Sequence, residues 1–145
     1  MNLNICNNCG GSYEYRGGTC TLVGIGSCTD TDIVIPSEYN GMRVTNIDYG
    51  AFRQCVSLKS VQLPKDLTSI GGSAFSECTN LKTVNAPSSL TEIKNSAFRL
   101  CIALEEIRYG GTGAQWNNIV FEGSWNASTG DYKVYCTNGT LAKNG

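Results

Sequence analysis

Hydrophobic positions recur along the chain with a fixed period. The segments GAFRQCVSLKSV (residues 50–61), SAFSECTNLKTV (73–84) and SAFRLCIALEEI (96–107) align without gaps, each 23 residues after the one before. A repeat this short has no room for two packed helices and their turns, so it predicts coils of short strands. The same step joins five apolar sets: Val44, Leu67 and Leu90; Ile47, Ile70 and Ile93; Phe52, Phe75 and Phe98; Cys55, Cys78 and Cys101; Leu58, Leu81 and Leu104.

Each copy contains two short segments with the pattern of a strand. In Val61–Leu63 apolar and polar residues alternate, as they do in a half-buried strand. Pro64 ends this segment at a point where its missing N–H does no harm. Leu67 and Ile70 predict a second short extended segment, after which the chain turns back toward the next copy.

Stacking explains why the same residues are repeated. One coil can bury its leucine, isoleucine and phenylalanine side chains only against the coils on either side. Each coil must therefore carry these residues at equivalent positions. Ile33–Pro36 matches Val61–Pro64, which extends the ladder upstream to about four strand rungs. Two files of core residues are expected along it: Phe52, Phe75 and Phe98, and Cys55, Cys78 and Cys101.

The repeats divide the chain into four parts. Residues 41–109 hold the three 23-residue repeats, and residues 13–40 are expected to form an N-terminal cap and the first rung. Residues 1–12 form an N-terminal tail with a Cys-x-x-Cys pair, and whether this tail is ordered stays open. Residues 110–145 lose the period and gain large aromatics, which predicts a C-terminal cap that covers the last coil.

The repeat unit L-x-x-V-x-L-P-x-x-L-x-x-I-x-x-x-A-F-x-x-C resembles the BspA-like leucine-rich repeat of bacterial and protist surface proteins. The resemblance extends from Tyr13 to Ala142 and includes the flanks GTCTLVGIGSCTDTDIVIPSEYNG and GTGAQWNNI. It implies a leucine-rich repeat solenoid, a right-handed coil of α/β type that is mostly β with short turns or 3-10 segments on its outer side. It also implies a non-enzymatic role in adhesion or protein recognition, in a secreted or cell-surface protein.

Composition and charge exclude several classes of partner. Eleven basic and twelve acidic residues give a net charge of −1 without a basic block, so we expect neither nucleic acid nor an anionic membrane as partner. No apolar run approaches the roughly 18–20 residues of a transmembrane helix, so no membrane insertion is expected. The segment MNLNICNNCGG has no basic start and no apolar region of a signal peptide, so a cytoplasmic location also stays open.

The chain contains no histidine. This excludes catalysis by Ser-His-Asp and Cys-His groups and every metal site that needs an imidazole. Glu105 and Glu106 are adjacent in sequence instead of facing each other across a cleft. We therefore expect no enzymatic activity and no cofactor.

The eight cysteines allow several readings. Cys55, Cys78 and Cys101 fit a stack of buried thiols better than disulfides between rungs, because parallel Cβ bonds about 4.8 Å apart are too far for the preferred bridge. Cys6 and Cys9 form half of a zinc knuckle, and zinc would need Cys20 and Cys28 as its other ligands. A Cys20–Cys28 disulfide across the cap is the favoured alternative in an oxidising compartment.

The outward residues of the strands form the candidate binding surface. If Val61 and Leu63 point inward, alternation sends their neighbours outward, and each rung repeats this. The surface is polar and carries charges of both signs, and no aromatic is expected in it, so it favours a protein partner, for example a host or matrix protein, over a sugar. The alternative is a structural spacer within a larger repeat protein. The contact candidates are Asp32, Ser60, Gln62, Thr83, Asn85, Glu106 and Arg108.

Overall fold

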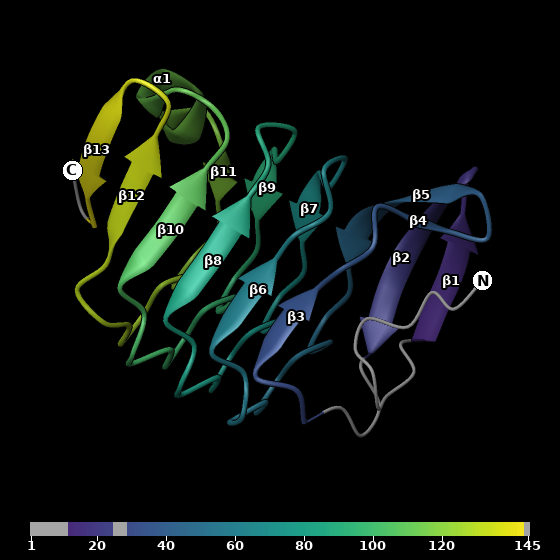
Figure 1. Cartoon of the computed structure of the whole chain (residues 1–145), viewed down its shortest axis with the longest axis horizontal. Helices are drawn as coiled ribbons and strands as arrows, with labels where there is room; N and C mark the ends of the chain where they lie inside the picture. The colour runs from purple at the N-terminus through teal and green to yellow at the C-terminus, as the bar shows by residue number, and fades with distance from the viewer. Residues whose placement is uncertain (1–11, 25–28, 144–145) are drawn as a thin grey trace.

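The computed structural model describes residues 12–24 and 29–143, which form a mostly-β solenoid of about five turns. Two sheets run along the molecule, and β1 and β13 lie at opposite ends of it (Figure 1). The front sheet has the order β13 (Gly139–Ala142), β12 (Lys133–Cys136), β10 (Glu106–Tyr109), β8 (Thr83–Ala86), β6 (Ser60–Gln62) and β3 (Asp32–Val34). The back sheet has the order β1 (Ser12–Arg16), β2 (Thr19–Gly24), β5 (Met42–Ile47), β7 (Ser69–Ile70), β9 (Glu92–Ile93) and β11 (Val120–Phe121), and β4 (Glu38–Tyr39) pairs with β5.

The 23-residue period sets the register of the front sheet. Ser60 pairs with Thr83, and Thr83 pairs with Glu106, in parallel ladders. The residue that follows each of these points inward and is buried, so the alternation along each strand matches the prediction. Leu63 N still donates to Asn85 O at 3.0 Å, and the pairing ends before the next residue, a proline, which has no N–H to donate.

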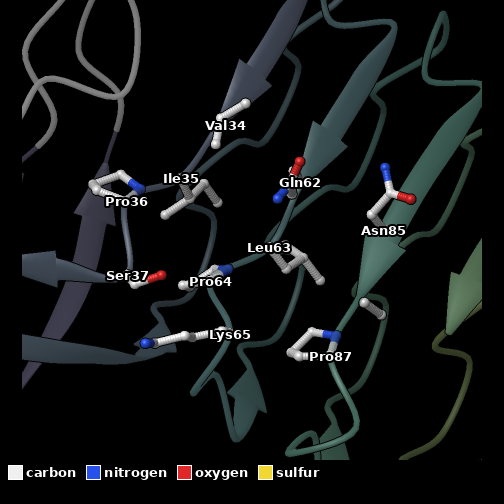
Figure 2. Close-up of a pocket in the computed structure, with 11 residues that line it drawn as sticks. Val34, Ile35, Pro36, Ser37, Gln62, Leu63, Pro64, Lys65, Asn85 and Pro87 are labelled. Atoms are coloured by element: carbon white, nitrogen blue, oxygen red, sulfur yellow. The ribbon is translucent and has the colours of Figure 1, made fainter. Parts of the chain in front are cut away.

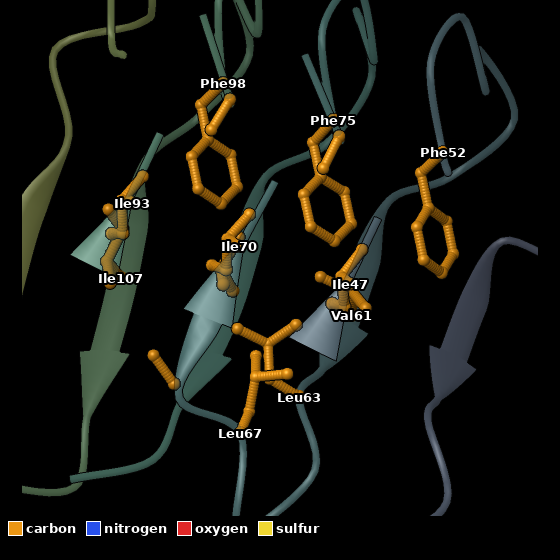
Figure 3. Packing of buried hydrophobic residues seen from close by; sticks show 14 of the residues in the cluster. Ile47, Phe52, Val61, Leu63, Leu67, Ile70, Phe75, Ile93, Phe98 and Ile107 are labelled. Carbon is orange, nitrogen blue, oxygen red and sulfur yellow. The ribbon is translucent and has the colours of Figure 1, made fainter. Parts of the chain in front are cut away.

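The three phenylalanines of the repeat form one aligned file in the interior (Figure 3). The ring centroids of Phe52 and Phe75 are 4.8 Å apart with planes 14° from parallel, and those of Phe75 and Phe98 are 5.1 Å apart with planes 2° from parallel. All three side chains are buried. The Trp125 ring meets Phe98 edge-on at 6.2 Å and covers the end of the file. The predicted phenylalanine file and the leucine-rich repeat solenoid fold are confirmed.

Each coil turns through two residues in the left-handed backbone region. The first position is filled by Gly50, Ser73 and Ser96, and the second by Gln54, Glu77 and Leu100, all with φ between 54° and 64°. Between these positions the turns hydrogen-bond to the next coil, as when Phe75 N donates to Ala97 O at 2.7 Å. The turns therefore stack in the same register as the strands.

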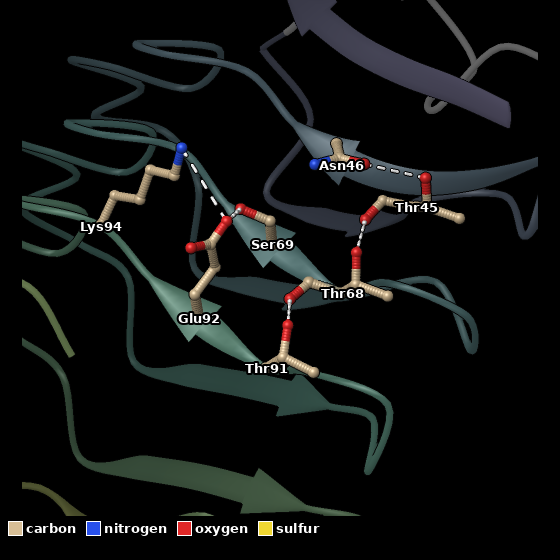
Figure 4. Close-up of polar contacts among 7 residues, drawn as sticks. All are labelled: Thr45, Asn46, Thr68, Ser69, Thr91, Glu92 and Lys94. Carbon is tan, nitrogen blue, oxygen red and sulfur yellow. Dashed lines mark hydrogen bonds and ion pairs between the residues drawn. The ribbon is translucent and has the colours of Figure 1, made fainter. Parts of the chain in front are cut away.

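A hydroxyl ladder joins the coils along the back sheet (Figure 4). Thr68 Oγ1 donates to Thr45 O at 3.1 Å, and Thr91 Oγ1 donates to Thr68 O at 3.0 Å. Next to this ladder, Ser69 Oγ donates to Glu92 Oε1 at 2.9 Å. Because the side chains of Thr68 and Thr91 each donate to the backbone of the preceding coil, these hydroxyls hold adjacent coils together.

The N-terminal part contains two hairpins in addition to the expected elements. The extra residues between the first rung and Val44 form the β4–β5 hairpin, which turns at Asn40 and Gly41 with φ of 50° and 80°. Positive φ at both central residues is the geometry of a tight two-residue hairpin turn. A second hairpin joins β1 to β2 through Gly17 and Gly18, so strand structure begins at Ser12, at the edge of the predicted tail.

The C-terminal part continues the solenoid for one more coil. Strand β12, which the sequence assigns to the cap, pairs in parallel with β10 and adds a fifth rung to the expected four. This coil holds the short helix α1 (Gly113–Asn117), whose N-cap Thr112 accepts from Gln115 N at 3.2 Å. In the part of the chain that is described, no helix has the length and apolar character needed to cross a membrane.

Candidate functional site

The front sheet presents two straight columns of side chains, which we call the outer columns. They form because each strand pairs with the next in unshifted parallel register. The first column contains Asp32, Ser60, Thr83, Glu106 and Lys133. The second column contains Val34, Gln62, Asn85, Arg108 and Tyr135. All seven contact candidates of the sequence therefore lie together on one face, whereas their contact with a partner stays a prediction.

Local hydrogen bonds fix a negative charge at the first rung. Ser60 Oγ donates to Asp32 Oδ1 at 2.6 Å, and Thr31 Oγ1 donates to Asp32 Oδ2 at 3.0 Å. These two bonds, the one from Ser60 foremost, lower the pKa of the Asp32 carboxyl below its usual value. Asp32 thus remains an exposed anion at one end of the outer columns.

The opposite end of the columns combines an ion pair with an aromatic ring. Arg108 Nε donates to Glu106 Oε2 at 3.0 Å, and a second guanidinium nitrogen lies 2.9 Å from the same oxygen. The Arg108 guanidinium carbon lies 5.6 Å from the ring centroid of Tyr135, in cation–π range. The charge of Arg108 is therefore shared between a carboxylate and a ring, which orients this long side chain on the face.

Tyr135 corrects the expectation that the columns contain no aromatic. Its side chain is 37% exposed and lies in the second column, in register with Arg108. The sequence signal was available, since Val134 is buried and alternation then sends Tyr135 outward. It was missed because the loss of the 23-residue period placed this strand in the cap. Val34, 60% exposed, is the apolar member at the other end of the same column.

A hollow of about 470 Å³ opens at the carboxyl ends of β3, β6 and β8, beside the second column (Figure 2). Pro36, Pro64 and Pro87 line it on three successive rungs, and the side chains of Gln62 and Asn85 border it. Lys65 is the charged residue among the residues that line it. We call this hollow the proline groove. Its mixture of rigid apolar rings, amides and one cation suits contact with another polypeptide chain.

The described thiols of the repeat are structural. Cys78 Sγ donates to Phe52 O at 3.0 Å and Cys101 Sγ donates to Phe75 O at 3.1 Å, and both residues are fully buried. Burial raises the pKa of the Cys101 thiol to about 12 and raises that of Cys78 further. Both cysteines are unbridged. A thiol held neutral in this way is inert, so the interpretation as a buried stack holds for these two residues. Cys55, the third member of the predicted stack, packs against the core but is only half-buried, because it lies in the first of the three turns.

The zinc and disulfide hypotheses involve residues that the structure does not describe. Cys6, Cys9 and Cys28 lie outside the described residues. Cys20 is buried and its Sγ lies 3.7 Å from Tyr39 O. Within residues 12–24 and 29–143, no three cysteine, aspartate or glutamate side chains are grouped as a metal site would require. The two hypotheses therefore stay predictions.

The aromatic side chains of the C-terminal part pack against one another in the interior. Trp116 and Trp125 are 6% and 9% exposed, and Trp116 lies against both Tyr109 and Phe121 with ring centroids 5.3 Å away. Tyr109 is buried in the inward register of the front sheet, as expected. These rings close the last coil and are not available as ligand platforms.

Comparison with solved structures agrees with this architecture. A leucine-rich repeat protein from Bacteroides capillosus is 28% identical, with a TM-score of 0.66, over 86% of this chain and 91% of that one. A T. pallidum leucine-rich repeat protein is 29% identical, with a TM-score of 0.65, over 70% of this chain. The match spans about half, 51%, of the T. pallidum protein. A Bacteroides ovatus leucine-rich repeat protein, 22% identical over 89% of this chain and 33% of that one, has the same fold with a TM-score of 0.69.

Sequence comparison assigns the family. A search of curated protein sequences found no match. The BspA type leucine-rich repeat region matches residues 27–132 with six copies. This span contains the first rung, the three regular repeats and the part of the irregular coil that precedes β12. The chain therefore belongs to the BspA-type leucine-rich repeat family.

Proposed function

We propose that the chain is a non-enzymatic interaction module that binds a protein partner through the outer columns and the proline groove. The observation that carries the proposal is the straight alignment of five rungs, which places ten outward side chains on one face beside the groove. Many modest polar contacts with an aromatic at one end are typical of a protein interface. Fold alone does not assign a function, so the proposal concerns this face and not the solenoid in general.

The proposed setting is a cell surface, where the module acts in adhesion to a host or matrix protein. BspA-type repeats are typically surface-associated, which supports this location. The mixed signs of the columns, from Asp32 at one end to Lys133 at the other, fit a partner with a similarly mixed surface. The proline groove and the columns adjoin, so one partner segment can contact both.

Binding of the purified chain to a panel of purified extracellular-matrix proteins tests the proposal. The test variant replaces Thr83, Asn85, Glu106, Arg108 and Tyr135 by alanine. Because these side chains lie on the surface, we expect the variant to fold normally and to lose at least tenfold in affinity. A separate Lys65→Ala variant reports on the proline groove.

A matched control replaces four exposed residues on the turns, away from the columns: Arg53, Val56, Arg99 and Ile102. This control is expected to bind like the unchanged chain. An equal loss of affinity in the control and test variants would contradict a role of the outer columns in binding. No binding by the unchanged chain to any panel member would instead favour the alternative role, a structural spacer in a larger repeat protein.

A further inference from the structure

Within residues 12–24 and 29–143, the front sheet ends in a strand with one unpaired edge. Among the described residues β13 (Gly139–Ala142) pairs with β12 alone, and Gly139, Thr140 and Ala142 are exposed. A strand at the edge of a sheet presents a row of N–H and C=O groups that can pair with another chain. In Figure 1 this strand lies at the far end of the solenoid from β1.

The other sheet edges carry features that oppose such pairing. β1 contains Glu14 and Arg16, whose side chains form an ion pair of 2.6 Å. β3 is three residues long, begins with the charged Asp32 and is followed two residues later by Pro36. β11 is two residues long. Short strands, charges and prolines are the devices by which proteins protect sheet edges.

β13 lacks these devices within its four residues, and the lysine that follows it is turned back onto its own copy, since Lys143 Nζ donates to Thr129 O at 3.4 Å. Its sequence Gly-Thr-Leu-Ala contains no charge and no proline, and its register with β12 is regular over four residue pairs. Leu141 pairs with the buried Val134 and therefore points into the molecule, where it packs beside Gly113 at the start of α1. It is only half-buried there, so apolar surface remains uncovered next to the open edge.

A second copy of the chain fits this edge by symmetry. A two-fold axis through Leu141 pairs the two β13 strands antiparallel and places the two Leu141 side chains opposite each other on the inner side. On the outer side Thr140 of one copy then faces Ala142 of the other. Lys133, the charged neighbour of Ala142 on β12, comes into line with Tyr135 of the second copy and not with the other Lys133. No like charges meet in this arrangement.

We infer that β13 is a self-association surface through which two copies pair about a two-fold axis. The pairing merges the two front sheets into one continuous sheet and covers the exposed part of Leu141. It also joins the outer columns of both copies into one longer face. Because only residues 140–142 of β13 pair with the same residues of the second copy, the dimer is weak and forms in a concentration-dependent manner.

Sedimentation equilibrium of the whole chain, from low micromolar to near-millimolar concentration, tests the inference. The unchanged chain is expected to shift from monomer to dimer over this range. Two variants, Thr140→Lys/Ala142→Lys and Thr140→Glu/Ala142→Glu, place like charges opposite each other, so each is expected to stay monomeric. An equimolar mixture of the two is expected to dimerise again, because lysine then faces glutamate at every pair.

The matched control, Val56→Lys/Ile102→Lys, adds the same charge at exposed positions far from β13 and is expected to dimerise like the unchanged chain. Circular dichroism melts of all variants establish that each one is folded. Three outcomes overturn the inference: an unchanged chain that stays monomeric throughout, charged variants that still dimerise alone, or an equimolar mixture that stays monomeric.

Discussion

At the residue scale, Phe75 occupies the central place in the interior. Its ring lies between Phe52 and Phe98 in nearly parallel stacks, and its side chain is fully buried. Phe75→Ala removes both stacks and leaves a cavity that rigid neighbouring coils cannot close. We expect the free energy of unfolding to fall by about 3–5 kcal/mol, measured by urea denaturation.

The control for this substitution is Val56→Ala, which removes an apolar side chain that is 56% exposed. It should change the free energy of unfolding by less than about 0.5 kcal/mol, as is usual for surface positions. If Phe75→Ala were equally mild, the phenylalanine file would not be the main contact between coils.

The buried thiols give the protein a defined response to alkaline pH. Burial raises the pKa of Cys101 from its ordinary value of 9.0 to about 12. Above pH 9 the unfolded chain therefore releases this proton while the native chain keeps it. Stability due to the neutral thiol is complete below pH 9 and is lost as the pH rises toward 12, by up to about 1.4 kcal/mol per pH unit.

Cys101→Ser tests this response, because serine retains a donor for Phe75 O and does not titrate in this range. Urea denaturation at several pH values above 9 should give a shallower loss of stability for the variant than for the unchanged chain. Parallel curves for the two proteins would contradict the role of Cys101. The readout is the slope, so a constant offset from altered packing does not affect it.

At the scale of elements, the turns contain a correctable strain. The position filled by Gly50 in the first repeat is filled by Ser73 in the second, with φ of 54°. A side chain in this backbone region costs about 1–2 kcal/mol, of which the greater flexibility of unfolded glycine cancels part. We expect Ser73→Gly to raise the free energy of unfolding by about 0.5–1 kcal/mol.

Thermal or urea denaturation measures this change against Ser88→Gly. Ser88 is an exposed loop residue with negative φ, so glycine there only adds freedom to the unfolded chain and should lower stability slightly. Opposite signs for the two substitutions are the expected result. A loss of stability in both would mean that the left-handed turn causes no strain in the stacked coils.

The elements differ in how far the sequence predicted them. Strands of the regular coils were predictable because Val61 and Val84 recur at the same inward position, and period fixes register. The two hairpins have local signals, Gly17-Gly18 and Asn40-Gly41, which are typical of tight hairpin turns. They were missed because a search for the repeat treats residues outside its period as insertions.

In the candidate site, too, some residues were predicted from the sequence and others were missed. Alternation alone placed Gln62 and Asn85 on the outer face, and the structure places them there. Tyr135 was missed because α1 lengthens the last coil and shifts its strand out of the 23-residue period. The proline groove forms because the prolines of three coils lie side by side. The alternation of residues within a single strand does not predict a hollow that several coils form together.

At the scale of the whole molecule, coils in regular register should be interchangeable. Each regular coil meets its neighbours through the same groups, from the threonine ladder to the phenylalanine file. Stability of a solenoid is then approximately a sum of terms within coils and between adjacent coils. This predicts that a complete coil can be removed without loss of the fold.

Deletion of residues 68–90 joins Leu67 to Thr91 and removes 23 residues, one full period. In the product Phe52 meets Phe98, and Ser60 pairs with Glu106, so every inward position remains inward. We expect a cooperative fold with lower stability and an m-value in urea lower by roughly one-sixth, because the surface exposed on unfolding scales with chain length. Far-ultraviolet circular dichroism during urea titration measures both quantities.

Deletion of residues 68–89 is the matched comparison, since it removes one residue fewer than the period. All residues after the junction are then displaced by one position, and in a strand such a shift turns buried side chains toward solvent. The extra residue must either bulge out of the junction, as the additional residues of the β4–β5 hairpin do, or displace the later coils from their register with the earlier ones. Either arrangement costs stability, so this variant should unfold at a lower urea concentration than the 68–90 deletion. If the two deletions behaved alike, coil register would not determine which residues share the interior, and the outer columns would lose their structural basis as well.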